Sequence, residues 1–310
     1  MNIPSRRTVL TAFAAAAATV PFAGDLGGRG TTAAAAGVPT PACAGTDAFC
    51  TNTGLYRNTL YTEGDHWARR YHRSGGVAQP GALSTFPATA VIAPHGGCIE
   101  PGTSELCLAV AGYRPEDATA VAGTPQYDYW MFEALRTGFH DALHITSTHC
   151  DDPAALAIVG GSAYAVSLHG RSDLPPSKGP AKQVLIGGAD TVFMQRVHDT
   201  LVQYRNAVGL TEADVALNIG TAGVDEDVNG NEPDNICNRT YTRGGVQLEM
   251  TTSMRSAMFG DFSSITGRRR SYGKAKDGAA DATTARYWNF FVNGLREAIA
   301  ANERGAVIPL

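Results

Sequence analysis

The chain has 310 residues, of which 25 are lysine or arginine and 29 are aspartate or glutamate, so its formal net charge is −4 at pH 7. This length, with 44% hydrophobic residues, is typical of one large globular domain or two small ones. The run Arg268–Arg270 has no interleaved aromatic residues and is typical of a solvated loop. A weakly acidic chain without a basic stripe is not expected to bind nucleic acid.

The first residues have the parts of an export signal. Arg6 and Arg7 precede an alanine-rich apolar run from Thr11 to Phe22, and small residues follow. This order is typical of a twin-arginine signal peptide, and the run is too short and too weakly hydrophobic for a stable membrane anchor. We therefore expect a signal peptide over residues 1–36 and a secreted protein; a disordered alanine-rich tail is the alternative. Without this segment, which holds three arginines and one aspartate, 22 basic and 28 acidic residues remain.

Six cysteines follow the expected signal, at positions 43, 50, 98, 107, 150 and 237. An even number in an exported chain favours disulfides. The preferred pair is Cys43 with Cys50, because it closes a short loop in a segment rich in proline, glycine and threonine that has little else to hold it. Cys98 lies beside the candidate metal ligands described below. A disulfide or a buried thiol is preferred there over a thiolate ligand, since a fully oxidised set leaves no thiolate for a metal.

Residues 37–60 show no sustained periodicity and are expected to form an irregular N-terminal segment, followed by one domain over residues 61–310. In chain order, the patterns predict strand 89–92, helix 104–111 with Thr103 as its N-cap, strands 143–147, 164–168 and 184–186, helix 191–208, strand 246–250 and helix 282–302. The last helix carries an apolar stripe of Tyr287, Phe291, Leu295 and Ile299. This alternation predicts a single α/β domain with a mixed β-sheet flanked by helices.

His95 and Glu100 lie five positions apart in a turn that follows strand 89–92. Gly96 and Gly97 between them let the backbone curl tightly enough for both side chains to face one Zn²⁺ ion. The alternative is a loop imidazole bonded to backbone, with Glu100 complementing the N-terminus of the next helix. Glu105, in the first turn of that helix, already places negative charge there, which leaves Glu100 for another role.

His169 is the natural third ligand, because strand 164–168 stops at a His-Gly turn where the imidazole would project from the sheet edge. Two histidines and one glutamate favour zinc among divalent ions and leave it an open position for water, as in a hydrolase. Glu249 lies inside an apolar strand, where a carboxylate is costly unless it is paired or close to a metal. It is a candidate general base, and a buried ion pair with an arginine is the alternative.

A long segment rich in glycine, asparagine and aspartate, residues 220–238, has no periodicity, and loops of this length are often functional. Asn238 and Arg239 close it. Arg239 could hold a substrate carboxylate in a bidentate fork, although an arginine near acidic sequence is more often in a surface ion pair. His144 and His149 could line the same cavity, but a lone strand histidine is usually a satisfied core residue.

Six motifs in one order resemble the poly-γ-glutamate hydrolase family, zinc peptidases similar in core to the carboxypeptidase A class. The resemblance covers about Tyr56 to Phe291 and rests on residues 93–105, 143–149, 167–170, 186–188, 235–239 and 245–250. It implies a carboxypeptidase A-like α/β fold in which His95, Glu100 and His169 bind zinc. It also implies that Glu249 is the catalytic acid/base, and that Asn238 and Arg239 hold a substrate carboxylate.

The activity implied by the resemblance is hydrolysis of γ-glutamyl amide bonds in poly-γ-glutamate or a related peptide. Zinc would lower the pKa of its water towards about 7 and polarise the scissile carbonyl, while Glu249 moves the proton. Such a polymer carries one free carboxylate per residue, which Arg239 would bind with help from Arg171 or Arg243. Because the chain is acidic, the positive potential toward this polyanion has to be local. The alternatives are a zinc amidase acting on cell-wall peptide and a secreted binding module without turnover.

Overall fold

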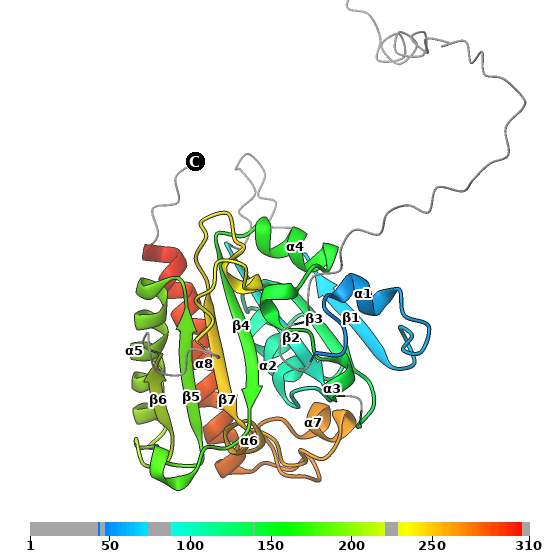
Figure 1. The fold of residues 1–310 in the computed structure, drawn as a ribbon. Coiled ribbons are helices and arrows are strands. Elements are labelled where there is room, and N and C mark those ends of the chain that lie inside the picture. The colour runs from blue at the N-terminus through cyan, green and yellow to red at the C-terminus, as the bar shows by residue number, and fades with distance from the viewer. Residues whose placement is uncertain (1–42, 44–46, 74–87, 139, 221–228, 306–310) are drawn as a thin grey trace, which may run out of the picture. The chain divides into compact units, whose positions relative to one another are not determined.

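The computed structural model describes residues 43, 47–73, 88–138, 140–220 and 229–305 (Figure 1). They belong to one compact unit that spans Pro41–Leu310. The predicted signal peptide, residues 1–36, lies outside the described residues, as do residues 221–228 of the long loop. Across the described ranges, no helix is both long enough and apolar enough to cross a membrane.

In this part of the chain, a seven-stranded sheet has the order β1-β3-β2-β4-β7-β5-β6. Its strands are β1 (Trp67–His72), β2 (Thr89–Gly97), β3 (Asp128–Ala134), β4 (Tyr164–Arg171), β5 (Gln183–Gly188), β6 (Ala216–Ile219) and β7 (Val246–Thr251). β1 is antiparallel to β3 and β5 is antiparallel to β7, whereas the other neighbours are parallel. The predicted fold class, a single α/β domain with a mixed sheet, is confirmed.

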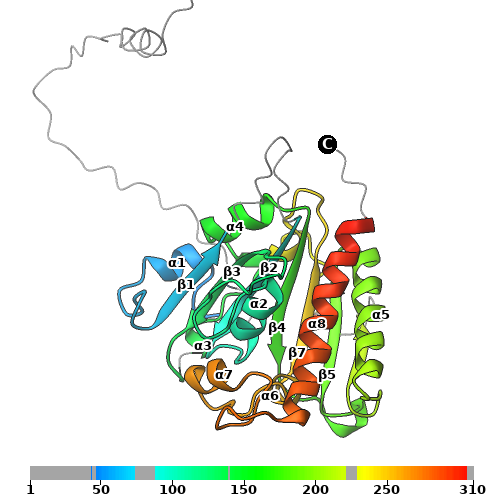
Figure 2. The same ribbon diagram turned by 180° about the vertical axis from the view of Figure 1, so that it is seen from behind.

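Helices cover both faces of the sheet. α2 (Thr103–Ala111), α5 (Thr191–Ala207) and α8 (Ala282–Gly305) lie on one face (Figure 2), and α1 (Asn52–Tyr56) and α4 (Pro153–Gly160) lie on the other. Side chains of β2 alternate between the two layers, since Val91 joins the first core and Ile92 the second. The remaining helical segments are α3 (His140–Leu143), η1 (Ser147–His149), η2 (Pro176–Lys178), η4 (Ile236–Asn238), α6 (Thr252–Ser256) and α7 (Ile265–Ser271).

Most of the predicted elements are present. The strands predicted at 89–92, 164–168, 184–186 and 246–250 correspond to β2, β4, β5 and β7, and the predicted helices correspond to α2, α5 and α8. The apolar stripe of α8 is buried, as predicted. The prediction of Thr103 as an N-cap is wrong. The cap of α2 is Gly102, and the hydroxyl of Thr103, the first helical residue, donates to the Glu100 carbonyl.

The strand predicted at 143–147 is wrong. α3 ends at Leu143 and η1 begins at Ser147. The backbone between them bonds to side chains instead of a neighbouring strand, because the Ile145 carbonyl bonds His95 and the Thr146 amide donates to Asp47. The sequence patterns also do not predict β1, β3 or β6. β3 is buried along its whole length, so it lacks the alternation that marks a half-buried strand.

The run Arg268–Arg270, predicted as a solvated loop, lies in α7. Arg268 is 1% exposed, and its guanidinium donates to the Glu105 carboxylate at 3.3 Å and to the Gly97 carbonyl at 2.8 Å. Arg269 donates to Glu133 at 3.3 Å. Both glutamates are buried and need positive partners. The arginines therefore neutralise acids beneath the His95–Glu100 turn.

Cys43 and Cys50 form a disulfide, as predicted. The even number of cysteines does not mean that all of them are paired, because the other four are free thiols: Cys98, Cys107, Cys150 and Cys237. The last three are buried and fill the core as small apolar groups. Cys98 is half-buried, and burial raises the pKa of its thiol. A thiol of raised pKa is a weak ligand and a weak nucleophile at neutral pH.

Candidate metal centre

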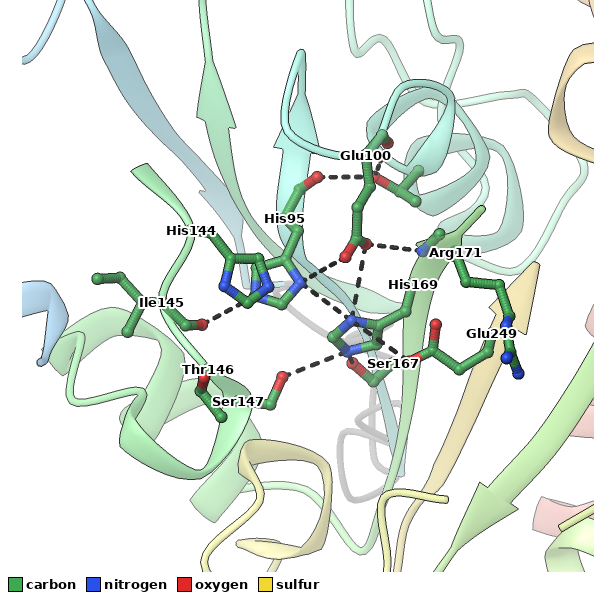
Figure 3. A network of polar contacts seen from close by, with 12 residues as sticks. His95, Glu100, His144, Ile145, Thr146, Ser147, Ser167, His169, Arg171 and Glu249 are labelled. Carbon is green, nitrogen blue, oxygen red and sulfur yellow. Dashed lines mark hydrogen bonds and ion pairs between the residues drawn. The ribbon is translucent and has the colours of Figure 1, made fainter. Parts of the chain in front are cut away.

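Three neighbouring parallel strands deliver the predicted site residues to one edge of the sheet. β2, β4 and β7 lie side by side, and His95, His169 and Glu249 occupy the carboxyl-terminal halves of these strands. Parallel strands bring such ends together, and ligands gather there. Glu100 lies in the turn between β2 and α2. The structure therefore brings these side chains into one cluster (Figure 3).

An irregularity in β2 aims His95 at the cluster. β2 pairs with β3 through Ala93 and Met131 and next through Gly96 and Glu133, so β2 has one more residue than its neighbour between these pairs. Bulges of this kind redirect side chains near active sites. Gly97 has a φ of 68°, and a Cβ added there would lie 2.2 Å from a backbone oxygen of β3. The turn therefore needs the glycine that the sequence places there.

His169 and Glu249 are paired in register on β4 and β7, and so are the residues two positions before them, Ser167 and Gln247. All four side chains therefore point to the same face of the sheet. Ser167 Oγ lies 3.0 Å from His169 Nε2, and Gln247 Nε2 donates to Glu249 Oε1 at 2.9 Å. Each strand thus carries its functional group together with a polar neighbour that orients it.

The donor atoms of the three predicted metal ligands converge. His95 Nδ1 lies 2.9 Å from Glu100 Oε1 and 3.1 Å from His169 Nδ1. His169 Nδ1 lies 3.7 Å from Glu100 Oε2. Two ligands of a tetrahedral zinc ion, each about 2.0–2.1 Å from the metal, are about 3.3 Å apart. The observed separations therefore suit donors around one ion.

The outer nitrogens of both imidazoles have hydrogen-bond partners, and both Nδ1 atoms face inward. The Ile145 carbonyl, which only accepts, lies 2.8 Å from His95 Nε2, so that nitrogen carries a proton. His169 Nε2 has the hydroxyls of Ser147 and Ser167 at 3.3 and 3.0 Å. Metal-binding histidines usually hold such partners on the ring nitrogen that does not bind the ion. Two inward imidazole nitrogens and a carboxylate make a donor set that fits zinc.

The cluster shifts the pKa values of its own members. Burial would raise the pKa of Glu100, but His95 and His169 outweigh it and hold that pKa well below its ordinary range. Burial likewise would lower the pKa of His95, and the Glu100 carboxylate reverses this and raises it. Burial raises the pKa of Glu249. This direction suits a carboxylate that accepts a proton and later returns it.

His144 also lies near the ligands, since one of its ligand atoms is within 4.8 Å of those of His95 and Glu100. Its Nδ1, however, is 2.7 Å from Asp47 Oδ1, and its ring lies against the His95 ring with 4.0 Å between centroids. His169 Nδ1, in contrast, lies 3.1 Å from His95 Nδ1, and its ring meets the His95 ring edge-on. We therefore take His169 as the third ligand and His144 as a neighbour of the site.

Comparison with known proteins identifies the family of the chain. The model of the poly-γ-glutamate hydrolase family matches residues 84–282. The chain belongs to this family. The UPF0714 protein YndL of Bacillus subtilis (strain 168) is 34% identical over 186 residues, which are 59% of this chain and 62% of YndL. The chain thus matches less than two thirds of the length of that relative.

Two solved structures are similar to the chain along most of its length. A bacteriophage poly-γ-glutamate hydrolase is 25% identical with a TM-score of 0.59, over 83% of this chain and 99% of that one. A structure described as zinc-free apo YndL is also 25% identical, with a TM-score of 0.56, over 84% of this chain and 100% of that one. The family predicted from the six motifs is confirmed.

In this member of the poly-γ-glutamate hydrolase family, a buried arginine that the sequence patterns do not single out supports the ligands. Arg255 is 3% exposed and donates to the carbonyls of Pro101, Met250 and Arg171. A Cβ added at Gly170 would lie 2.4 Å from Arg255 Cζ. The Gly170 amide donates to Glu100 Oε2 at 2.7 Å. Arg255 thus ties the ligand turn to the ends of β4 and β7.

Asn238 and Arg239 lie at the end of η4 and just after it. The Asn238 amide is 1% exposed; it accepts from the Ala189 amide and donates to the carbonyls of Gly230 and Glu232. In this structure the Asn238 amide therefore holds the loop in place. Arg239 donates to the carbonyls of Thr148, Cys150 and Asp234. It braces the η1 turn that presents Ser147 to His169.

The other two predicted arginines differ in position. Arg171 ends β4, and its side chain lies beside Glu249 in Figure 3. Its charge opposes the effect of burial on the pKa of Glu249. Arg243 is exposed in the turn before β7. Arg171 is therefore the predicted substrate arginine that lies next to the candidate base.

Proposed function

We propose that this protein is an exported zinc-dependent hydrolase that cleaves γ-glutamyl amide bonds of poly-γ-glutamate or a related peptide. The observation that carries the proposal is the convergence of His95 Nδ1, His169 Nδ1 and the Glu100 carboxylate. Glu249 Oε1 lies 3.9 Å from His169 Nδ1, which places a carboxylate next to the proposed metal. Family membership and the likeness to a structure described as zinc-free YndL support the metal and the reaction class.

The chain's own residues would divide the chemistry between them. His95, Glu100 and His169 would hold the ion, which when bound polarises an amide carbonyl and makes a water more acidic. Glu249 would take the proton of the attacking water and return it to the leaving amine. The raised pKa that burial gives Glu249 helps it to hold the proton between these transfers. Gln247 donates to Glu249 Oε1 and fixes the carboxylate in place.

The substrate carries its own recognition group. A γ-glutamyl polymer presents one free carboxylate per residue, close to each amide. Arg171, beside Glu249, is placed to bind such a carboxylate. Arg239, which follows η4 and donates to the carbonyls of Thr148 and Cys150, would add a second positive charge. The net charge of −4 would repel a polyanion at long range, so binding would depend on the local charge of zinc and these arginines.

Export is part of the proposal. Arg6 and Arg7 before an alanine-rich apolar run support a twin-arginine signal, and the disulfide between Cys43 and Cys50 suits an oxidising compartment. The test fuses residues 1–36 to a reporter that is active only outside the cytoplasm. We expect activity that disappears when both arginines are changed to lysine. Equal activity with and without the arginines would contradict a twin-arginine signal.

The reaction is tested by incubating zinc-loaded protein with poly-γ-glutamate and following the polymer's chain length. We expect shortening that stops when a chelator removes the metal and returns when zinc is restored. Parallel incubations with α-linked polyglutamate and with cell-wall peptide test the linkage. Cleavage of cell-wall peptide alone would favour the amidase alternative. Zinc binding without cleavage of any of these substrates would favour a binding module.

A further inference from the structure

A buried carboxylate from the N-terminal segment reaches the edge of the metal centre. Asp47 lies between Cys43 and Cys50, in the loop that their disulfide closes. Its side chain is 3% exposed, and its Oδ1 lies 2.7 Å from His144 Nδ1. Its Oδ2 accepts from the Thr146 amide at 2.6 Å. Both carboxylate oxygens are therefore committed to the segment that leads into η1.

Further contacts hold this N-terminal segment against the same turn. The Thr53 amide donates to Asp151 Oδ1 at 2.8 Å, and the Tyr56 hydroxyl donates to Asp152 Oδ2 at 2.8 Å. Phe49 packs against the second core. All of these N-terminal residues precede residue 84, where the match to the family model begins. The segment that contacts the His144 region therefore lies outside the part of the chain that the family model matches.

His144 is the most exposed of the three histidines at the cluster. Its side chain is 36% exposed, whereas those of His95 and His169 are each 4% exposed. Figure 3 shows His144 and Glu249 on opposite sides of the three predicted ligands. A substrate that approaches the proposed metal from this side would meet the His144 ring.

Asp47 also fixes which nitrogen of His144 faces the site. A carboxylate can only accept a hydrogen bond, so His144 Nδ1 carries the proton that lies between them. In the neutral ring Nε2 then bears a lone pair and can only accept. One ligand atom of His144 lies within 4.8 Å of those of His95 and Glu100. Since Nδ1 is bonded to Asp47, Nε2 is the nitrogen available to a bound molecule.

We propose that His144, oriented by Asp47 from the disulfide-closed loop, is a substrate-binding residue whose Nε2 accepts a hydrogen bond from an amide N–H of the chain being cut. This inference rests on the proposed function and adds a recognition group to it. The amide N–H is the one donor that every γ-glutamyl linkage carries, whereas the carboxylates are left to the arginines. His144 thus binds the backbone of the substrate on the side opposite Glu249.

The test measures binding without turnover. Zinc-loaded Glu249→Gln protein is titrated with a short γ-glutamyl oligomer by calorimetry, and His144→Ala and Asp47→Asn are added to it separately. The Asp47→Asn change keeps the size of the side chain, but its amide would donate to Nδ1, which moves the ring proton to Nε2 and turns the acceptor into a donor. We expect each change to weaken binding about tenfold, the size of one lost hydrogen bond, with zinc content unchanged.

Asp151→Asn is the matched control. It alters a carboxylate that holds the same N-terminal segment through Thr53 without touching His144. We expect its affinity to stay within about twofold of the parent. Equal affinity in all variants would overturn the inference and leave the proposed function intact, and so would a loss as large in the control as in Asp47→Asn. A zinc-loaded parent that binds no γ-glutamyl oligomer would overturn the proposed substrate, and this inference with it.

Nitrogen NMR of the imidazole rings gives a second measurement. If His144 had only a structural role, its ring-nitrogen resonances would not change when substrate is added. In the Glu249→Gln parent, the unprotonated nitrogen of His144 should be Nε2, and addition of the oligomer should shift its resonance. In the Asp47→Asn variant the proton should move to Nε2. An Nε2 resonance that ignores the oligomer would contradict the contact.

Discussion

His169 and Glu249 stand directly opposite one another on two parallel strands, with His169 Nδ1 3.9 Å from Glu249 Oε1. Two residues earlier on each strand, Ser167 and Gln247 are paired in the same way. Their side chains hydrogen-bond those of His169 and Glu249, respectively. The sheet register alone therefore sets the distance between a proposed metal ligand and the proposed base. A slip of either strand by one residue would turn its own functional group into the opposite core and separate the pair.

Removal of a ligand should remove the metal. We expect His169→Ala to reduce bound zinc from about one ion per chain to nearly none, because two remaining donors do not hold zinc at a catalytic site. Metal analysis after dialysis measures this. His198→Ala is the control, since His198 lies on the surface of α5 paired with Asp199. Full zinc content in His169→Ala would show that another residue is the third ligand.

Removal of the base should leave the metal in place. We expect Glu249→Gln to keep zinc while kcat on poly-γ-glutamate falls by roughly 10²–10⁴, the usual contribution of a general base. The amide that replaces the carboxylate would still accept from Gln247 but could not take a proton. Metal content and turnover are measured on the same preparation. Turnover within a few-fold of the original protein would show that another group moves the proton.

Zinc affinity should depend on pH through His95. In the metal-free protein, Glu100 outweighs burial and raises the pKa of His95, so a proton competes with zinc at the ligand nitrogen at higher pH than for an ordinary histidine. Zinc affinity should therefore rise as pH rises through about 6.5 and level off only above the raised pKa of His95. If zinc displaces one proton, the affinity should increase by up to about tenfold per pH unit.

The lowered pKa of Glu100 keeps that carboxylate ionised over the same pH range, so Glu100 does not contribute to the pH dependence of zinc affinity. Competition with a chelator of known affinity, between about pH 5.5 and about pH 8.5, measures the dependence. Affinity that stays constant over this range would contradict the proton competition at His95.

The contact between Gly170 and Arg255 should be sensitive to one added carbon. We expect Gly170→Ala to destabilise the fold by about 1–3 kcal/mol, because its Cβ would overlap a guanidinium that three backbone carbonyls hold in place. Zinc binding should weaken as well, since the Gly170 amide bonds Glu100. Thermal unfolding and zinc titration measure the two effects.

Gly160→Ala is the matched control for this substitution. Its added Cβ would meet the Arg239 carbonyl oxygen only at 3.8 Å, an ordinary contact distance. We expect unchanged zinc binding and a melting temperature that does not fall. Equal behaviour of the two variants would show that the space at Gly170 is not limiting.

The sequence predicts those parts of the site whose chemistry is local. His95 and Glu100 are five positions apart around a Gly-Gly pair, and His169 and Glu249 each interrupt an apolar strand, so each stands out from its own neighbours. The contact of Asp47 with His144 joins residues 97 positions apart, and neither segment has a sequence pattern that predicts it. The role of Arg255 is not predictable from the sequence either, because its partners are backbone carbonyls that any residue could supply.

The errors in the fold have physical causes of the same kind. Ile145 and Thr146 have the β-branched side chains of a strand, but their backbone groups bond to His95 and Asp47. Arg268 resembles a surface charge until Glu105 is found buried beside it. In each case a tertiary partner overrides a local preference, and these partners gather around the metal centre.

The central claim is that His95, Glu100 and His169 hold zinc beside Glu249. A crystal structure of the zinc-soaked protein, with anomalous difference maps recorded on both sides of the zinc edge, tests it most directly. We predict one peak within zinc-ligand distance of His95 Nδ1, His169 Nδ1 and the Glu100 carboxylate, with Glu249 adjacent and unligated. A peak ligated by His144 in place of His169, or none among these side chains, would contradict the account.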